Sequence, residues 1–412
     1  MRTHQNKRLC QVESKVLLGT AIKHSGERGC NEEDEKDKLE DSIPNDLEVD
    51  ILTRLPAKTL LKFRCVSKMW SYIIRSQSFV DSHYALSSST RSRFTVTFCN
   101  ALIVPDDTKR LFIFSSSFEE EDKSSSLVAK LDMTVPTVVL TYRWKCPSIH
   151  GFIGCINNSF QFIVCNPSTR QVITLPTKGS RSSLGYDPVG HQFKVLNLVT
   201  SPDMFPDYLV HEFITLGGGG EVSRSQVTTA PYYPVTDGVY INGSIYYGAW
   251  APKLRMDPVI VCFDVRHEKI SFIKAPRNVV FWETESILMD YRGKLASVLV
   301  NPYSPFRSFG LLILEDAKKH EWSKQTFELP FPLVDVTSPG TNKAGEIIFA
   351  PNTLPPVDKP FFIFYYNVEK KDMRRVRLHG VADDEEFRRR YGLQDTMRVT
   401  ITPEHFESIA SL

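Results

Sequence analysis

The sequence lacks the long apolar segments and the excess charge of one sign that would assign a chain to a membrane or to nucleic acid. Its apolar runs are short, such as residues 361–366, whereas a membrane-spanning helix needs about 20 apolar residues. The 50 Lys and Arg residues are balanced by 48 Asp and Glu, so no basic surplus is available for phosphate backbones. We therefore expect neither a membrane nor a nucleic-acid partner.

Closely spaced cysteine pairs and a secretory signal are also missing. Eight cysteines are scattered at positions 10, 30, 65, 99, 146, 155, 165 and 262, without a Cys-x-x-Cys pair. No small-residue cleavage site follows the mildly apolar residues 16–22. This combination is typical of a reduced intracellular chain.

Apolar side chains, by contrast, are plentiful enough for a large core. Hydrophobic residues make up 42% of the 412 positions. At about 150 residues per domain, this length predicts two or three units, or one small unit and a large repeat domain. Residues 1–41 differ, because they are polar and end in an acidic run, and we predict a disordered leader there rather than an interaction tail.

Helical periodicity begins directly after this leader. Apolar side chains recur every three or four residues from Ile43 to Leu55, and Pro44 stands where a first helical turn tolerates a missing N–H. Pro56 ends this helix, a second short helix follows, and Ser67 is placed to cap a third. Three short helices bury little apolar surface between them, so we expect a partner to cover part of it.

From residue 92 onward the apolar period changes to two, which indicates β-strands. A strand followed by a polar turn recurs six times, at residues 110–114, 160–164, 209–216, 259–263, 311–314 and 361–366. The turns lie near residues 116, 166, 216, 264, 315 and 367, which are 48 to 52 residues apart. A period of about 50 residues has room for four strands and predicts a kelch-like β-propeller.

The predicted fold is α+β multidomain, with a short three-helix domain followed by a mainly-β domain that forms a six-bladed β-propeller. The predicted domains are a leader at 1–41, a helical domain at 42–84, the propeller at 92–402 and a C-terminal tail at 403–412. We expect residues 397–401 to close the ring beside residues 94–98, and residues 383–390 to form a surface helix. An irregular β domain with fewer closed blades is the alternative.

Residues 43–70 carry a recognisable motif. They read IPNDLEVDILTRLPAKTLLKFRCVSKMW, which follows a pattern of Leu-Pro-x-Asp-Leu, then Glu-Ile-Leu-x-Arg-Leu-Pro, then Lys-Ser-Leu-x-Arg-Phe-Arg-x-Val-Cys-Lys-x-Trp. The segment resembles the plant-type F-box, from which it departs by conservative replacements at Ile43, Asp50, Thr59, Lys62 and Ser67. In the β region, CNPSTRQVITLP at 165–176, LGYDP at 184–188 and VYINGSIY at 239–246 resemble the F-box-associated interaction domain of plant F-box proteins.

The resemblance implies a non-catalytic subunit of an SCF-type ubiquitin ligase. The F-box would dock on a Skp-type adaptor, which joins a cullin scaffold and a RING subunit, and the β domain would bind a protein substrate. The location would be the nucleus, the cytoplasm or both. The expected adaptor contacts are Ile43, Pro44, Leu47, Ile51, Leu52, Leu55, Pro56, Leu60 and Val66, which have the helical spacing of groove-binding anchors. For Phe63 and Trp70 we favour a place in the motif's own core.

Catalytic motifs are not found in the sequence. It has no His-Glu-x-x-His, Gly-x-Ser-x-Gly, Walker or Gly-x-Gly-x-x-Gly motif, and we expect no cofactor. Cys146, His150, Cys155 and Cys165 match no zinc spacing, so we interpret the cysteines as packed hydrophobes and expect no metal. A propeller-type hydrolase or carbohydrate-binding protein without a ligase role is the alternative function.

Substrate recognition is expected on propeller loops that combine aromatic and charged residues. Tyr233, Trp250 and Arg255 fit this description, because exposed aromatic residues beside Arg often anchor interfaces. The alternative is that these aromatic side chains pack between blades.

Overall fold

The computed structural model describes residues 45–90, 92–100, 109–117, 126–136, 138, 146–157, 159, 161–177, 181–200, 207–217, 222–252, 257–280, 287–300, 305–357, 359–394 and 397–412. The predicted leader at 1–41 lies outside them. The chain divides into two compact units. The helical unit consists of the residues up to Arg91 together with Glu407–Ala410, and the β unit consists of Ser92–Phe406 together with Ser411–Leu412. None of the described helices has the length and apolar character needed to cross a membrane.

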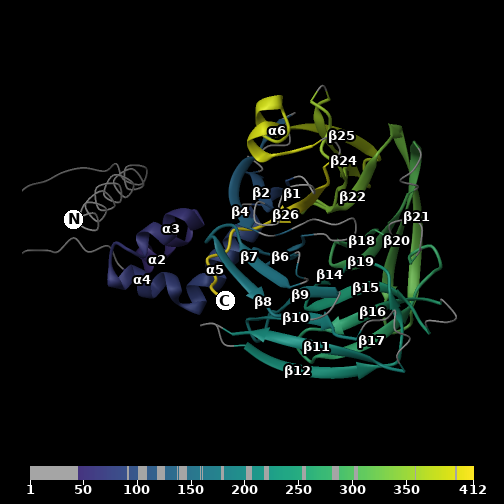
Figure 1. Cartoon of the computed structure of the whole chain (residues 1–412), viewed down its shortest axis with the longest axis horizontal. Coiled ribbons are helices and arrows are strands. Elements are labelled where there is room, and N and C mark those ends of the chain that lie inside the picture. Colours follow the sequence, from purple (N-terminus) through teal and green to yellow (C-terminus); the bar gives the residue numbers. More distant parts are fainter. Residues whose placement is uncertain are drawn as a thin grey trace, which may run out of the picture. The chain divides into compact units, whose positions relative to one another are not determined.

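The described part of the helical unit contains four helices rather than the predicted three (Figure 1). They are α2 (Asn45–Thr53), α3 (Ala57–Phe63), α4 (Lys68–Arg75) and α5 (Gln77–Thr90). Ser67 caps α4, since its hydroxyl oxygen accepts a hydrogen bond from the Trp70 N–H at 3.0 Å. The additional helix is α5, in which Phe79 and His83, one turn apart, are both buried.

One apolar cluster holds the helical unit together. Its buried members are Leu52, Ala57, Leu60, Phe63, Ile74, Phe79 and Ile409. Trp70 packs against this cluster: its ring stacks on Phe63 with centroids 5.1 Å apart, and its Nε1–H donates to the Glu48 carboxylate at 3.2 Å. Phe63 and Trp70 therefore lie in the motif's own core, whereas Ile409 comes from the far end of the chain.

The β unit is a six-bladed β-propeller, as predicted. We number its blades in chain order. Blade 1 contains β26 (Val399–His405), β1 (Arg93–Cys99), β2 (Arg110–Ser117) and β4 (Lys130–Pro136). Blade 2 contains β5 (Ser148–Ile149), β6 (Phe152–Ile156), β7 (Phe162–Asn166) and β8 (Gln171–Leu175). Blade 3 contains β9 (Arg181–Asp187), β10 (Gln192–Leu198), β11 (Leu209–Leu216) and β12 (Val222–Thr229).

The other three blades follow the same antiparallel order. Blade 4 contains β13 (Tyr233–Pro234), β14 (Val239–Ile241), β15 (Ser244–Trp250), β16 (Pro258–Asp264) and β17 (Lys269–Lys274). Blade 5 contains β18 (Ile287–Tyr291), β19 (Lys294–Leu299), β20 (Phe306–Asp316) and β21 (Glu321–Leu333). Blade 6 contains β22 (Val336–Thr341), β23 (Ile347–Pro351), β24 (Phe361–Asn367), β25 (Asp372–His379) and, by parallel pairing to β25, β3 (Ser126–Val128).

The two ends of the β unit meet in blade 1. β26 pairs antiparallel with β1, so that Ile401 lies opposite Val96 and Val399 opposite Phe98. This is the pairing expected for residues 397–401 and 94–98. The ring is thus closed by hydrogen bonds between the last and the first strand of the unit.

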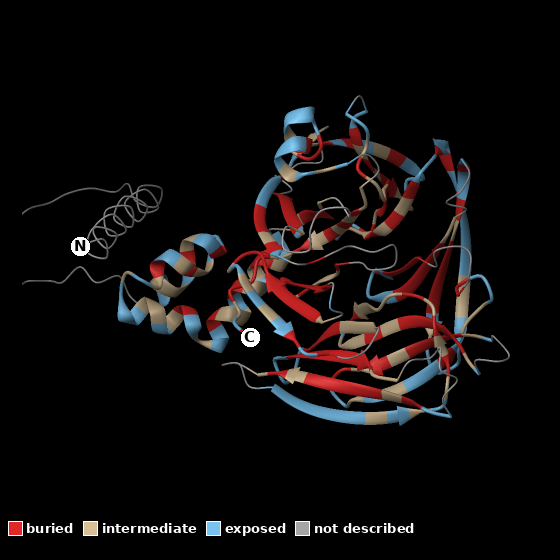
Figure 2. Ribbon diagram, in the orientation of Figure 1, coloured by how far each residue is buried: buried red, intermediate tan, exposed pale blue. Residues whose placement is uncertain are grey.

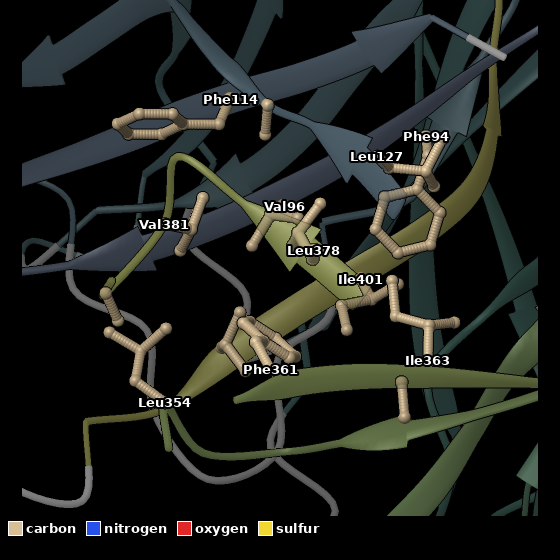
Figure 3. Packing of buried hydrophobic residues seen from close by; sticks show 14 of the residues in the cluster. Phe94, Val96, Phe114, Leu127, Leu354, Phe361, Ile363, Leu378, Val381 and Ile401 are labelled. Atoms are coloured by element: carbon tan, nitrogen blue, oxygen red, sulfur yellow. The ribbon is translucent and has the colours of Figure 1, made fainter. Parts of the chain in front are cut away.

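Apolar clusters between neighbouring blades form the core of the propeller. Many strands are buried on both faces, as in β7, where all five residues are buried (Figure 2). Between blades 6 and 1, Phe94 and Val96 pack with Phe361, Ile363 and Leu378 (Figure 3). In the apolar run 361–366, Phe361, Ile363, Tyr365 and Tyr366 are buried and Phe362 and Phe364 are half-buried, so neither face of this strand is fully exposed.

Polar side chains fix the turns between the third and fourth strands of several blades. The side-chain oxygens of Asn166, Asp264 and Asn367 each accept two hydrogen bonds from backbone N–H groups two and three residues further on. Asn and Asp favour turns for this reason. Of the six predicted turns, those at Asn166, Asp264 and Asn367 are therefore confirmed as hairpin turns.

The predicted surface helix is α6 (Glu385–Tyr391). Asp384 caps it, since its carboxylate accepts the Phe387 N–H at 2.7 Å, and Gly392 ends it with a φ of 64°. Phe387 and Tyr391 pack against Phe114 in blade 1, with ring centroids 5.7 and 5.5 Å away. The helix covers apolar surface of blade 1, and its charged side chains are exposed except for that of Arg388, which is buried.

Candidate functional site

Two apolar side chains of α2 remain on the surface of the helical unit. Leu47 is 52% exposed, and Ile51, one turn further on, is half-buried. The Asp50 carboxylate and the Arg54 guanidinium pair at 3.1 Å, one turn after Leu47 and Ile51, respectively. An apolar centre with charged neighbours is the usual composition of a protein-binding surface.

Two residues expected to contact an adaptor lie in the core instead. Leu52 is 2% exposed and Leu60 is fully buried. Both belong to the cluster that also contains Phe63 and Ile409, so their side chains are already enclosed within the unit. The structure therefore reassigns Leu52 and Leu60 from the expected contact surface to the core.

The remaining expected contacts are of three kinds. Pro56 is exposed, and Leu55 and Val66 are half-buried against the core cluster. Ile43 and Pro44 lie outside the described residues. Leu47 and Pro56 are thus the exposed residues among the predicted contacts in the described part of the chain.

α4 contributes two exposed apolar residues that the sequence analysis did not select. Met69 is 52% exposed and Tyr72 is 78% exposed, and their spacing of three residues places them on one side of the helix. Trp70 and Ile74 of the same helix are directed to the core cluster. The sequence did contain a signal for these exposed residues. This short helix has more apolar residues than a single core-facing stripe can bury, so some of them must remain on the surface.

The propeller contains a cavity of about 60 Å³ lined by residues of blades 2, 3 and 4. Its lining includes the polar residues Arg181, Ser183 and Asp237 and the apolar residues Phe162 and Leu196. A pocket for a small organic ligand usually has about 300 to 1,000 Å³, whereas a water molecule needs roughly 10 to 15 Å³. This cavity accepts a few water molecules or the tip of one side chain.

Hydrogen-bonded aromatic residues lie beside this cavity. The Tyr232 hydroxyl bonds to the Tyr247 hydroxyl and lies 3.4 Å from Nε2 of His211. Burial lowers the pKa of His211 to about 4 and raises the pKa of both tyrosines. All three side chains are therefore uncharged at neutral pH, and His211 lacks the pKa near 7 that suits a general acid or base.

Four buried cysteines lie in one apolar cluster between blades 1 and 2. They are Cys99, Cys146, Cys155 and Cys165. Burial raises the pKa of the Cys146 thiol, so it stays protonated and unreactive. His150, which the sequence analysis considered together with these cysteines, is not part of the cluster and lies against Tyr186, with ring centroids 3.8 Å apart. Within the part of the chain that the structure describes, no group of three or more His, Cys, Asp or Glu could hold a metal ion.

The expected substrate-binding residues have different environments. Trp250 is 7% exposed, packs in the cluster between blades 4 and 5, and donates its Nε1–H to the Val280 carbonyl at 3.4 Å. Tyr233 is half-buried and stacks on Trp250 with centroids 6.3 Å apart. Arg255 lies outside the described residues. Trp250 thus has the packing role that was the alternative to recognition.

We expect Trp250→Phe to lower the free energy of unfolding of the propeller by about 1 to 2 kcal/mol. The smaller ring leaves a cavity between blades, and the Val280 carbonyl loses its indole donor. Chemical denaturation followed by circular dichroism measures this change, with Tyr208→Phe, at a 57% exposed position, as the control. Unchanged stability in Trp250→Phe would return this residue to the candidates for recognition.

Comparison with known proteins identifies a known domain family in each of the two units. The F-box domain matches residues 41–82, and the F-box associated beta propeller domain matches residues 100–406. F-box protein At1g30790 of Arabidopsis thaliana is 51% identical over 395 residues, which cover 90% of this chain and 98% of that protein. F-box protein DOR of the same plant is 32% identical over 373 residues, which cover 84% of this chain and 90% of that protein.

Proposed function

The chain belongs to the F-box proteins with an F-box-associated β-propeller domain, and from this premise we propose that it is the substrate-recognition subunit of an SCF-type ubiquitin ligase. The helical unit docks on a Skp-type adaptor, and through it on a cullin and a RING subunit. The propeller holds a protein substrate for ubiquitylation and performs no chemistry. This role places the chain inside the cell, in the nucleus, the cytoplasm or both.

The observation that carries this proposal is the exposure of large apolar side chains on a unit that has its own closed core. Leu47 and Met69 are each 52% exposed and Tyr72 is 78% exposed, while Leu52 and Leu60 fill the interior. Exposed apolar residues grouped on short helices favour a protein partner that buries them. No observation on the described residues favours the hydrolase or carbohydrate-binding alternative.

Replacing Tyr72 by Asp in the full chain tests the docking. We expect the affinity for a purified Skp-type adaptor to fall by roughly tenfold or more, because an unpaired carboxylate would be buried against apolar partner surface. The melting temperature should stay unchanged, since the side chain is exposed in the free chain. Val189→Asp, at a 58% exposed position of the propeller, is the matched control. Equal binding by Tyr72→Asp and Val189→Asp would refute docking through this surface.

The same variant serves to find substrates. A chain that keeps its propeller but joins the ligase poorly should retain bound substrates and promote their ubiquitylation less. We expect co-precipitation with Tyr72→Asp to enrich proteins that become ubiquitylated only in the presence of the wild-type chain. If no protein behaves in this way, the receptor role of the propeller fails while adaptor docking can still hold.

A further inference from the structure

The segment of residues 407–410 is part of the helical unit, although it follows the last strand of the propeller. β26 ends at His405, and Glu407–Ala410 belong to the compact unit of α2 to α5. Glu407 and Ser408 are 2% exposed, and Ile409 is 5% exposed. Burial of this degree, in a segment without helix or strand, indicates specific contacts rather than a loose tail.

The first of these contacts is a hydrogen bond to the start of α3. Pro56 precedes α3 and offers no side-chain acceptor for the first N–H groups of the helix. The N–H of Ala57, a fully buried residue, donates instead to the Glu407 carboxylate at 3.0 Å. Since a buried N–H without an acceptor is strongly unfavourable, Glu407 supplies for α3 what a capping side chain usually supplies.

The second contact is apolar. Ile409 lies in the same cluster as Leu52, Leu60 and Phe63, which come from α2 and α3. The four helices α2 to α5 enclose a small core, so one additional buried aliphatic side chain is a substantial part of it. Without Ile409, a cavity would remain between the helices, and their packing would loosen.

Both flanks of the segment are held within the β unit. His405 pairs with Arg93 in blade 1. The Leu412 backbone N–H and carbonyl make hydrogen bonds of 3.3 and 3.1 Å with the side chain of Gln171 in β8. The segment is therefore bounded on both sides by ordered residues of the β unit, unlike a free tail.

We propose that residues 407–410 are an integral part of the adaptor-docking unit and that Glu407 and Ile409 are positioning residues for adaptor binding. They act through α3: they hold it against α2, and thereby hold the exposed residues of the unit in a binding-competent arrangement. This inference rests on the proposed adaptor docking. It predicts that an F-box excised without the C-terminal segment binds its adaptor less well than the full chain.

The test compares the full chain with its Glu407→Ala/Ile409→Ala variant. We expect backbone hydrogen exchange in α2 to α4 to accelerate by roughly tenfold or more, while exchange in β15 and β16 stays unchanged. The dissociation constant for a purified Skp-type adaptor should rise by roughly fivefold or more, because a smaller fraction of molecules is binding-competent. Glu369→Ala/Val357→Ala, which removes an exposed Glu and an exposed Val from the propeller, is the matched control.

A milder variant keeps the test decisive if the double variant does not fold. Ile409→Leu, made with Glu407 unchanged, retains the buried volume, so its hydrogen exchange and its adaptor affinity should equal those of the wild type. Ile409→Ala, made in the same way, should show faster exchange and weaker adaptor binding. Unchanged exchange in α2 to α4, or accelerated exchange with unchanged adaptor affinity, would overturn the inference. Absence of adaptor binding by the wild-type chain would instead refute the proposed function on which the inference rests.

Discussion

Replacing Val399 and Ile401 of β26 by alanine is expected to lower the free energy of unfolding of the propeller by roughly 4 kcal/mol or more. The two side chains are 6% and 7% exposed and lie opposite Phe98 and Val96 of β1. Their truncation leaves cavities at the position where the ring closes. A typical domain has only about 5 to 15 kcal/mol of stability, so this variant should lose a large fraction of it.

Thermal and denaturant unfolding of the full chain measure this loss, with Thr400→Ala as the control. Thr400 is half-buried on the same strand, and its carbonyl continues to accept the hydrogen bond from the Thr97 hydroxyl at 3.2 Å. The control should change the unfolding free energy by less than about 1 kcal/mol. An equally small change in the double variant would mean that closure by β26 contributes little to the stability of the propeller.

The six-fold repeat was predictable because each repeated segment has the same position in its blade. The segments selected from the sequence became β2, β7, β11, β16, β20 and β24, each the third strand of its blade. A third strand is paired on both edges and largely buried, so it stands out in the sequence as an apolar run. Asn166 and Asp264 then mark the turn that follows, because their side chains satisfy its backbone N–H groups.

Contacts between distant parts of the sequence could not be predicted in the same way. β3 lies between β2 and β4 of blade 1 in the chain, yet it pairs in parallel with β25 of blade 6. Ile409 likewise packs in the helical core against residues that are more than 300 positions away in the sequence. Neither contact changes the local periodicity or turn chemistry, and these were the only signals that a single sequence provides.

The candidate docking surface was predicted in part. The helical spacing of the F-box segment identified the apolar residues correctly, but spacing alone does not divide them between core and surface in helices of seven to nine residues. Leu52 and Leu60 were therefore placed on the contact surface, whereas Met69 and Tyr72 were missed. Only the packing of α2 to α5 on one another decides which stripe remains exposed.

A second large effect is expected from Glu404 on β26. Burial raises the pKa of its carboxyl from 4.5 to about 7, the Asp290 carboxylate adds to this rise, and Lys343 opposes it. Its Oε1 atom is buried and has no hydrogen-bond partner among the described residues. A carboxylate with one buried oxygen that accepts no hydrogen bond is unfavourable, so the folded chain holds a proton there that the unfolded chain releases.

Glu404→Gln is expected to stabilise the propeller above pH 7 and to leave it unchanged below about pH 4.5. Between these values the folded wild-type chain binds one more proton at Glu404 than the unfolded chain, so its stability falls as the pH rises. At 1.36 kcal/mol per pH unit, the wild-type chain loses roughly 3 kcal/mol of unfolding free energy at this site between about pH 4.5 and pH 7. The glutamine is neutral throughout and does not pay this penalty.

The difference between variant and wild type has to be measured, because the wild-type curve alone mixes opposing contributions. Burial lowers the pKa of His150 and of His211 to about 4, so each of them makes the folded state more stable as the pH rises from about 4 to 6.5. These contributions cancel when denaturant unfolding of Glu404→Gln and wild type is compared at pH 5 and pH 8. Glu385→Gln, at an exposed position of α6, controls for the change of net charge. A difference that is the same at both pH values would show that Glu404 is ionised in the folded propeller like an exposed glutamate, and that its burial is relieved by a contact with water.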